Sequence, residues 1–393
     1  MREFFPLEPG KRFLALRLIS ILALVELVRN GLYFGFLNIL ALEHNGYSLA
    51  SVGIAASLHY GSDTLLRGFG GFLTERFGVG RVLVSSTVLA LGGFWGVIQA
   101  DQPWELWLAA LIHGAALAPI WPGVMASIGR LALPGHQGRA LGIAQGMVMP
   151  FLGGGFMVAG LLTRADPTLS YYFLAGGTVL ALVMALSAAG FSPHLEAARS
   201  APQERSFTKV LPLLPAAFAQ TFAGGLLVPI LFPYLDLLKA PDWVLVAGLV
   251  ILGGVLYGSL QFTGRWVDRG GSKLPLSLGF SLTALMLGLM AIPPEFSLML
   301  LLLVSGGIGF ALIMPGWNGL VIRLLPQKNL AGYWGILMTA EGIGTALGPA
   351  VATTLFEQVS FRAPFLIGAA IYIGIAIFYW VFLSRVNVAP EVP

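Results

Sequence analysis

The sequence contains no cysteine and very little charge. Without Cys, disulfides, thiolate metal sites and thiol nucleophiles are all excluded. Only 10% of its 393 residues are charged, whereas a soluble domain has about a quarter. Most of the chain must therefore face something other than water. The five His form no set with metal-ligand spacing, and we expect no cofactor other than an ion gradient.

Hydrophobic residues make up 57% of the chain and form segments that recur from end to end. Their lengths lie near the ~20 residues that span a bilayer, which predicts an all-α polytopic membrane protein with twelve transmembrane helices. The first segment is too long for the core of a cleavable signal peptide, so we expect it to remain. The predicted spans are 13–42, 48–74, 82–100, 105–128, 140–164, 171–191, 210–238, 243–264, 274–292, 297–322, 332–358 and 363–384.

Lys and Arg are concentrated in alternate loops. The loops after the second, fourth, sixth, eighth and tenth spans are basic, whereas the others are nearly free of Lys and Arg. Because basic loops stay in the cytoplasm, both termini are predicted to be cytoplasmic. The formal charge of +4 is then a sign of topology, and no nucleic-acid partner is expected.

A hydrophilic loop at 192–209 divides the chain into halves, 1–191 and 210–393. Two repeats support this division. GFLTERFGVGR (71–81) matches TGRWVDRGGSK (263–273), and PIWPG (119–123) matches PGWNG (315–319). The sequence therefore predicts two similar six-helix halves, an architecture in which substrates bind at the interface near the middle of the membrane.

Five ionisable residues lie within the first two spans. Glu26 and Arg29 are spaced i, i+3, and His59, Asp63 and Arg67 follow one another at i, i+4, so each group shares a helix face. A charge at this depth costs at least ~2.5–3.5 kcal/mol on insertion scales. Each therefore needs a partner or a function.

Two interpretations of these charges remain open. In the functional one, Glu26 or Asp63 takes up and releases a proton, with His59 as a relay, while Arg29 and the adjacent Asn30 bind an anionic or hydroxyl-rich group. In the structural one, they are self-paired ions that only hold helices together.

The second half has much less charge at depth. Glu341 is its one buried acidic residue, with Gln220, Gln261 and Asn318 as its main polar partners among long apolar runs. A cavity between such halves is polar on one wall and apolar on the other, which suits an amphiphilic substrate. Alternatively, Glu341 only holds helices together, through a hydrogen bond to a neighbouring Trp or backbone group, and does not contact the substrate.

Trp121 and Trp317 occupy equivalent positions, each two residues after a proline in the middle of its span. A proline kink frees backbone groups, which is tolerated where a helix lines a cavity. Aromatic rings at such a place stack on sugars or glycerol, and helix packing is the alternative.

The repeated loop carries a family resemblance, because it resembles the signature loop of the major facilitator superfamily. GxxxGP at Gly344, Gly348 and Pro349 and the related GxxMPxxGG from Gly146 are similar to its antiporter motif, although Met149 stands where the motif has Gly. The resemblance implies the major facilitator fold and a gating role for the loop residues Gly71, Glu75, Arg76, Arg81, Asp268 and Arg269.

Five further segments, including VELVRNGLYFGFLNILAL, SLHYGSD and APIWPGVMASI, resemble the glycolipid flippases of lipoteichoic-acid synthesis. The resemblance implies proton-coupled antiport of a glycolipid anchor in the plasma membrane of a bacterium, and we expect a monomer. It assigns proton coupling and head-group binding to residues equivalent to Glu26, Arg29, His59, Asp63 and Trp121, and Arg164 matches a basic residue late in the fifth span. Glu75-Arg76 replaces the family's Lys-Lys pair.

The leading hypothesis is a proton-coupled flippase for a glycolipid or lipid-linked sugar, with lipid, bilayer and protons as its partners. A multidrug or small-sugar exporter that uses the same carboxylates is the alternative within transport. The loops have no DxD, HxxxxD or GxSxG motif, so an enzyme is not expected. A scaffold has no evident use for paired charges in the membrane.

Overall fold

The computed structural model describes residues 6–8, 10–43, 47–133, 136–191, 210–293, 295–325 and 330–385. By internal contacts the chain forms two compact units, Met1–Arg199 and Ser200–Pro393. The predicted central loop, 192–209, lies outside the described residues, so the limits given for the halves stay a prediction.

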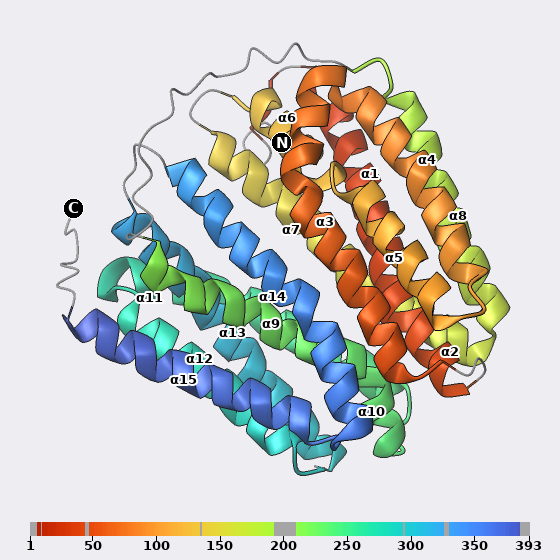
Figure 1. Cartoon of the computed structure of the whole chain (residues 1–393). Coiled ribbons are helices and arrows are strands. Elements are labelled where there is room, and N and C mark those ends of the chain that lie inside the picture. The colour runs from red at the N-terminus through yellow and green to blue at the C-terminus, as the bar shows by residue number, and fades with distance from the viewer. Residues whose placement is uncertain are drawn as a thin grey trace. The chain divides into compact units, whose positions relative to one another are not determined.

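The first unit is helical almost throughout its described length (Figure 1). Its first span is one helical run with a π-helical turn in the middle. The elements are α1 (Arg12–Asn30), η1 (Gly31–Phe36), α2 (Leu37–Glu43), α3 (Leu49–Phe77), α4 (Val79–Ile98), α5 (Pro103–Leu117), α6 (Ile120–Leu131), α7 (Gln137–Ala165) and α8 (Pro167–Ser187).

The second unit repeats this order of long helices. Its elements are η3 (Leu211–Leu213), α9 (Leu214–Leu227), η4 (Val228–Ile230), α10 (Leu231–Leu237), α11 (Trp243–Gly270), α12 (Lys273–Met290), α13 (Phe296–Leu324), α14 (Leu330–Gln358) and α15 (Ala363–Arg385).

Twelve helical runs of the described chain match the twelve predicted spans. Ten are long and apolar enough to cross a membrane on composition alone. The other two are α1–α2 and α3, which carry Glu26, Arg29, Asp63 and Arg67. Their charged side chains reduce the mean hydropathy, yet both runs are long enough to cross a bilayer. The all-α polytopic prediction is confirmed.

Local sequence sets several helix ends. Asp166 caps α8 by accepting a hydrogen bond from the Thr168 amide at 2.8 Å, with Pro167 in the first turn. Gly78 ends α3 with φ +86°, and Gly271 ends α11 with φ +78°. Both glycines lie in the repeated loops, where a left-handed backbone favours Gly.

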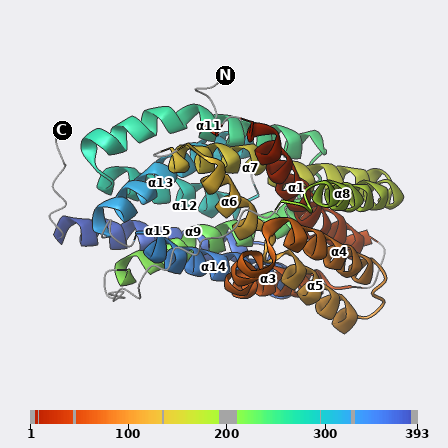
Figure 2. The same cartoon turned by 90° about the horizontal axis from the view of Figure 1, so that it is seen from above.

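The two units share one packing scheme. In the first unit, α1 packs on α7 and α8, and α5 lies between α3 and α4. In the second, α9 packs on α14 and α15, and α13 contacts α11 and α12. The view from above shows α3, α5 and α4 side by side (Figure 2). The repeat seen in the loops therefore extends to the packing of the helices.

Each helix that carries buried charges lies close to a neighbouring helix at a glycine. A Cβ on Gly155 of α7 would overlap the Leu27 carbonyl of α1, and one on Gly114 of α5 would overlap the His59 carbonyl of α3. Small residues allow such close approach between membrane helices. The backbones of α1 and α3 are thus held firmly on α7 and α5.

Candidate functional site

Four charged side chains of the first unit form one continuous network. Arg29 donates from Nε to Glu26 Oε2 at 2.8 Å and from Nη1 to Asp63 Oδ2 at 3.1 Å. Arg67 donates from Nη2 to the same Asp63 oxygen at 2.8 Å. The two pairs predicted from sequence spacing are both present, and the Arg29–Asp63 contact joins them across α1 and α3.

The centre of this network is removed from solvent. Glu26 and Asp63 are each 1% exposed and Arg29 is 8% exposed. Arg67 is less enclosed, with 29% of its side chain exposed. Two carboxylates and two guanidiniums are formally neutral together, so the network satisfies the requirement that buried charges be paired.

Neutral polar groups complete the network. Asn30 donates to the Glu26 backbone oxygen at 2.8 Å and to Glu26 Oε2 at 3.4 Å. The Tyr60 hydroxyl donates to Asn30 Oδ1 at 3.2 Å, and its ring lies 4.9 Å from the Arg29 guanidinium carbon. A cation over an aromatic face is attracted to it. Asn30 was predicted for this site, whereas Tyr60 was not.

A π-helical turn follows directly after Arg29 and Asn30. It covers Gly31–Phe36, all of whose residues are buried. A Cβ on Gly35 would come within 2.7 Å of the Phe156 carbonyl of α7, so the turn lies tightly on that helix. Single π-turns within α-helices are frequent at functional sites, and this one is adjacent to the charged network.

His59 belongs to a second cluster instead of the charged stripe predicted for α3. Its ring centroid lies 4.3 Å from that of Tyr33 and 4.9 Å from that of His113. The Tyr33 hydroxyl and His113 Nδ1 are hydrogen-bonded at 3.1 Å. The backbone of Ala110 is nearby, but neither His59 nitrogen has a hydrogen-bond partner within the described residues.

Sequence reasoning missed Tyr33, Tyr60 and His113. His113 is 2% exposed and Tyr33 is completely buried. His113 had a signal, since it is a polar residue eight positions before Trp121 in the same span. The two tyrosines had none, because Tyr is an ordinary residue of membrane helices.

The polar group predicted for the second unit is small. Gln220 of α9 donates to Glu341 Oε1 of α14 at 3.1 Å. Thr221 donates to the Glu341 backbone oxygen at 2.7 Å, and Tyr372 donates to the Gln220 backbone oxygen at 3.3 Å. Glu341 is partly buried and held by neutral donors. The side chain of Gln261 lies outside the described residues.

The remaining predicted head-group residues are scattered over several helices. Trp121 is partly buried on α6, directly after the break that separates α5 from α6. Trp317 is 3% exposed and its Nε1 has no hydrogen-bond partner among the described residues. Helix α13 runs unbroken through Pro315, so the two Trp positions differ locally. Asn318 is exposed on α13 and Arg164 is partly buried in the last turn of α7.

Most of the predicted gating residues lie at the surface. Glu75, Arg76, Arg81 and Arg269 are exposed. Gly71 accepts a hydrogen bond from Thr74 Oγ1 at 2.7 Å. The side chain of Asp268 lies outside the described residues. The gating role implied by the resemblance stays a prediction.

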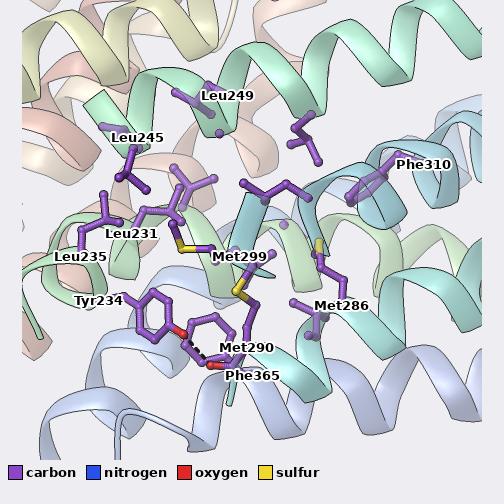
Figure 3. Close-up of a pocket in the computed structure, with 18 residues that line it drawn as sticks. Leu231, Tyr234, Leu235, Leu245, Leu249, Met286, Met290, Met299, Phe310 and Phe365 are labelled. Atoms are coloured by element: carbon purple, nitrogen blue, oxygen red, sulfur yellow. Dashed lines mark hydrogen bonds between the residues drawn. The ribbon is translucent and has the colours of Figure 1, made fainter. Parts of the chain in front are cut away.

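An apolar cavity lies within the second unit (Figure 3). Its volume is about 230 Å³, and side chains of α9–α13 and α15 surround it. Met286, Met290 and Met299 point towards its centre, as Figure 3 shows. The Tyr234 hydroxyl at its edge is hydrogen-bonded to the Met290 backbone oxygen at 2.6 Å, which leaves the wall without a free polar side chain among those that line it.

These geometries limit the chemistry that the chain can perform. No group of three or more His, Cys, Asp or Glu in the described part of the chain could hold a metal ion. The groups suited to chemistry are the two carboxylates that share Arg29. They can exchange protons when their counter-ion moves, because a buried charge that loses its partner is neutralised.

The family described as the Major Facilitator Superfamily matches residues 19–262 and 254–393. The similar curated proteins include three that are named proton-coupled antiporter flippase LtaA. The one from Staphylococcus saprophyticus is 24% identical and that from Staphylococcus epidermidis 23%, each with 94% of both chains covered. The one from Staphylococcus aureus is 22% identical, with 92% of this chain and 93% of that protein covered.

Two solved structures share the fold. The nucleoside transporter NupG superposes with a TM-score of 0.70 at 15% identity, covering 95% of this chain and 100% of that one. A point mutant of NupG gives 0.72 at 16% identity, with 94% and 99% covered. At this identity the likeness concerns the fold alone.

Proposed function

The chain belongs to the major facilitator superfamily, and from that premise we propose that it is a proton-coupled flippase for a glycolipid or lipid-linked sugar. The superfamily consists of transporters and not enzymes. The relatives named as proton-coupled antiporter flippases are similar along nearly the whole chain. That similarity supports antiport in a bacterial cell membrane. The pattern of basic loops supports the placement of both termini in the cytoplasm.

The observation that carries the proposal is the contrast between the polar sites of the two units. The first unit buries two carboxylates and an arginine in one hydrogen-bonded network. Among its described side chains, the second unit has one partly buried carboxylate, Glu341, and it contains an apolar cavity of about 230 Å³. An amphiphile with a sugar head and acyl chains matches both environments, whereas a wholly polar solute matches only one.

Proton coupling follows from the sharing of Arg29. While Arg29 bonds Glu26 and Asp63, both carboxylates share this guanidinium as hydrogen-bond donor and counter-ion. A hydroxyl-rich or anionic head group that attracts Arg29 removes that counter-ion, so that one carboxylate takes up a proton. Release of the substrate restores the ion pairs and expels the proton. Substrate and proton then compete for the site, as antiport requires.

Further residues are assigned supporting roles in this proposal. His59 lies one turn from Asp63 on α3 and is assigned the role of relay, which requires its ring to turn away from Tyr33 and His113. Asn30, Trp121, Trp317, Asn318, Glu341 and Arg164 contribute to head-group binding. The signature loops gate the exchange of conformations, and no cofactor is needed beyond the proton gradient.

A liposome assay with the purified protein tests the proposal. With a pH gradient imposed, a fluorescent glycolipid should become accessible to a quencher in the opposite leaflet faster than in liposomes without protein. The Asp63→Asn variant is the matched control, since it keeps the shape of the side chain and loses its charge. If the protein does not move glycolipid but transports a soluble drug or sugar, the flippase proposal is wrong and the exporter hypothesis takes its place.

A further inference from the structure

A second hollow lies in the first unit, away from the charged network. It is a groove of about 670 Å³ with walls from α3 and α4 and a floor from α5 and the α5–α6 junction. Phe69, Leu89 and Ile112 line it and are 57%, 59% and 46% exposed. Large apolar side chains so exposed on a membrane helix face acyl chains instead of water. None of the residues of the charged network lines this groove.

Small residues explain why the groove exists. The floor contains Ala115, Ala116 and Ala118, which leave room between the flanking helices. Gly70 of α3 lies directly on Pro119, where a Cβ would come within 2.6 Å of the proline Cα. The close contact fixes the floor, while the large residues of α3 and α4 form raised walls above it.

The length of the groove matches one leaflet of a bilayer. On α3 its lining runs from Leu66 to Phe77, eleven residues further along, which corresponds to about 16 Å at 1.5 Å per residue. The hydrocarbon core of a bilayer is about 30 Å thick, so the groove covers about half of it. An acyl chain that enters from one membrane face can therefore follow the groove to the middle of the bilayer.

Arg81 is the one charged residue among those that line the groove, and it lies at one end. Arg81 and Ser85 stand in the first two turns of α4, next to Phe77 at the end of α3. The neighbouring exposed charges are Glu75 and Arg76, so this end is positive by one charge. The Ser85 hydroxyl is hydrogen-bonded to the Arg81 and Val82 carbonyls, which leaves the Arg81 guanidinium as the group suited to an anion.

We propose that this groove binds one anionic phospholipid of the cytoplasmic leaflet, with its phosphate on Arg81 and one acyl chain along the apolar walls. The basic-loop pattern predicts that the Arg81 end lies at the cytoplasmic face, where anionic lipids attract basic side chains. The bound phospholipid is a resident of the membrane and is distinct from the transported substrate, which the proposed function assigns to the charged network.

Native mass spectrometry of the full-length protein with phosphatidylglycerol tests this site, with phosphatidylcholine as the neutral lipid. Arg81→Gln removes the anion contact, and Ser85→Phe fills the groove from an exposed position. The matched controls are Arg130→Gln, an exposed arginine at the end of α6, and Val88→Phe, which is exposed on α4 but does not line the groove. Leu89→Trp replaces Ser85→Phe if that variant does not elute as a folded monomer.

We expect one phosphatidylglycerol to be retained by the unaltered protein and by both controls. Its retention should fall about fivefold in Arg81→Gln, the effect of one basic side chain on an anionic lipid, and at least as much in the groove-filling variant. Equal retention of the two lipids, no loss in either groove variant, or an equal loss in Val88→Phe would overturn the proposal.

Discussion

Arg29 on α1 donates to Asp63 on α3 at 3.1 Å, and this one hydrogen bond joins two intrahelical ion pairs into a single network. The guanidinium also donates to Glu26 at 2.8 Å. Both carboxylates therefore share this cation, and Asp63 also accepts a hydrogen bond from Arg67 at 2.8 Å. Any displacement of Arg29 weakens the ion pairing of both carboxylates at once. This is the physical basis of the proposed competition between substrate and proton.

Arg29→Ala is expected to destabilise the protein strongly. Removing one member of a buried ion pair leaves uncompensated charge and costs roughly 3–5 kcal/mol, whereas Arg67→Ala, at a site with 29% of the side chain exposed, should cost at most about 1 kcal/mol. Thermal unfolding of the two variants in the same detergent measures the difference. Equal melting temperatures would show that Arg29 is not the central counter-ion.

Tyr33→Phe is expected to lower stability by about 1–3 kcal/mol, because the buried His113 Nδ1 loses its hydrogen-bond partner. His113→Phe should remove the same bond from the other side. The double variant should then lose less than the sum of the two single losses. Strictly additive losses in chemical unfolding would mean that this hydrogen bond contributes nothing.

Two neighbouring glycines of α7 offer a matched test of the α1–α7 contact. A Cβ on Gly155 overlaps the Leu27 carbonyl, whereas one on Gly153 meets nothing within 4 Å. Gly155→Ala should therefore cost about 1–3 kcal/mol by overpacking, and Gly153→Ala should gain up to about 1 kcal/mol from helix propensity. A higher melting temperature for Gly155→Ala than for Gly153→Ala would contradict the packing described for α1.

Filling the apolar cavity should impair the lipid activity selectively. Gly224 lines that cavity, and a Cβ there meets nothing within 4 Å. Gly224→Leu is expected to slow glycolipid flipping in liposomes without lowering thermal stability. Gly374→Leu, at an exposed and equally open position of α15, is the control and should flip glycolipid normally. Identical flipping rates in the two variants would show that the cavity does not accommodate the acyl chains of the substrate.

Most of the fold is predictable because span length is set by the bilayer. The first span, predicted at 13–42, is observed as Arg12–Glu43, and the last, predicted at 363–384, as Ala363–Arg385. The breaks within the spans are harder to predict from the sequence. The π-turn at Gly31–Phe36 depends on the fit of α1 to α7, and Pro315 leaves α13 unbroken although the α5–α6 break lies at the equivalent Pro119.

The site is predictable only as far as local spacing extends. Glu26–Arg29 and Asp63–Arg67 follow from helix periodicity, and both pairs are present. The Arg29–Asp63 bond depends on how α1 and α3 are rotated about their axes, which hydropathy does not determine. The same rotation brings His59 to Tyr33 and His113 instead of towards the carboxylates.

The central claim is that the carboxylates bound by Arg29 couple protons to substrate movement. Proteoliposomes that contain a pH-sensitive dye inside and fluorescent glycolipid in one leaflet report both fluxes together. The account predicts that Glu26→Gln and Asp63→Asn lose proton flux coupled to flipping, whereas Asp166→Asn, which keeps its capping role at the exposed start of α8, retains it. Coupled proton flux that persists in both carboxylate variants would contradict the account.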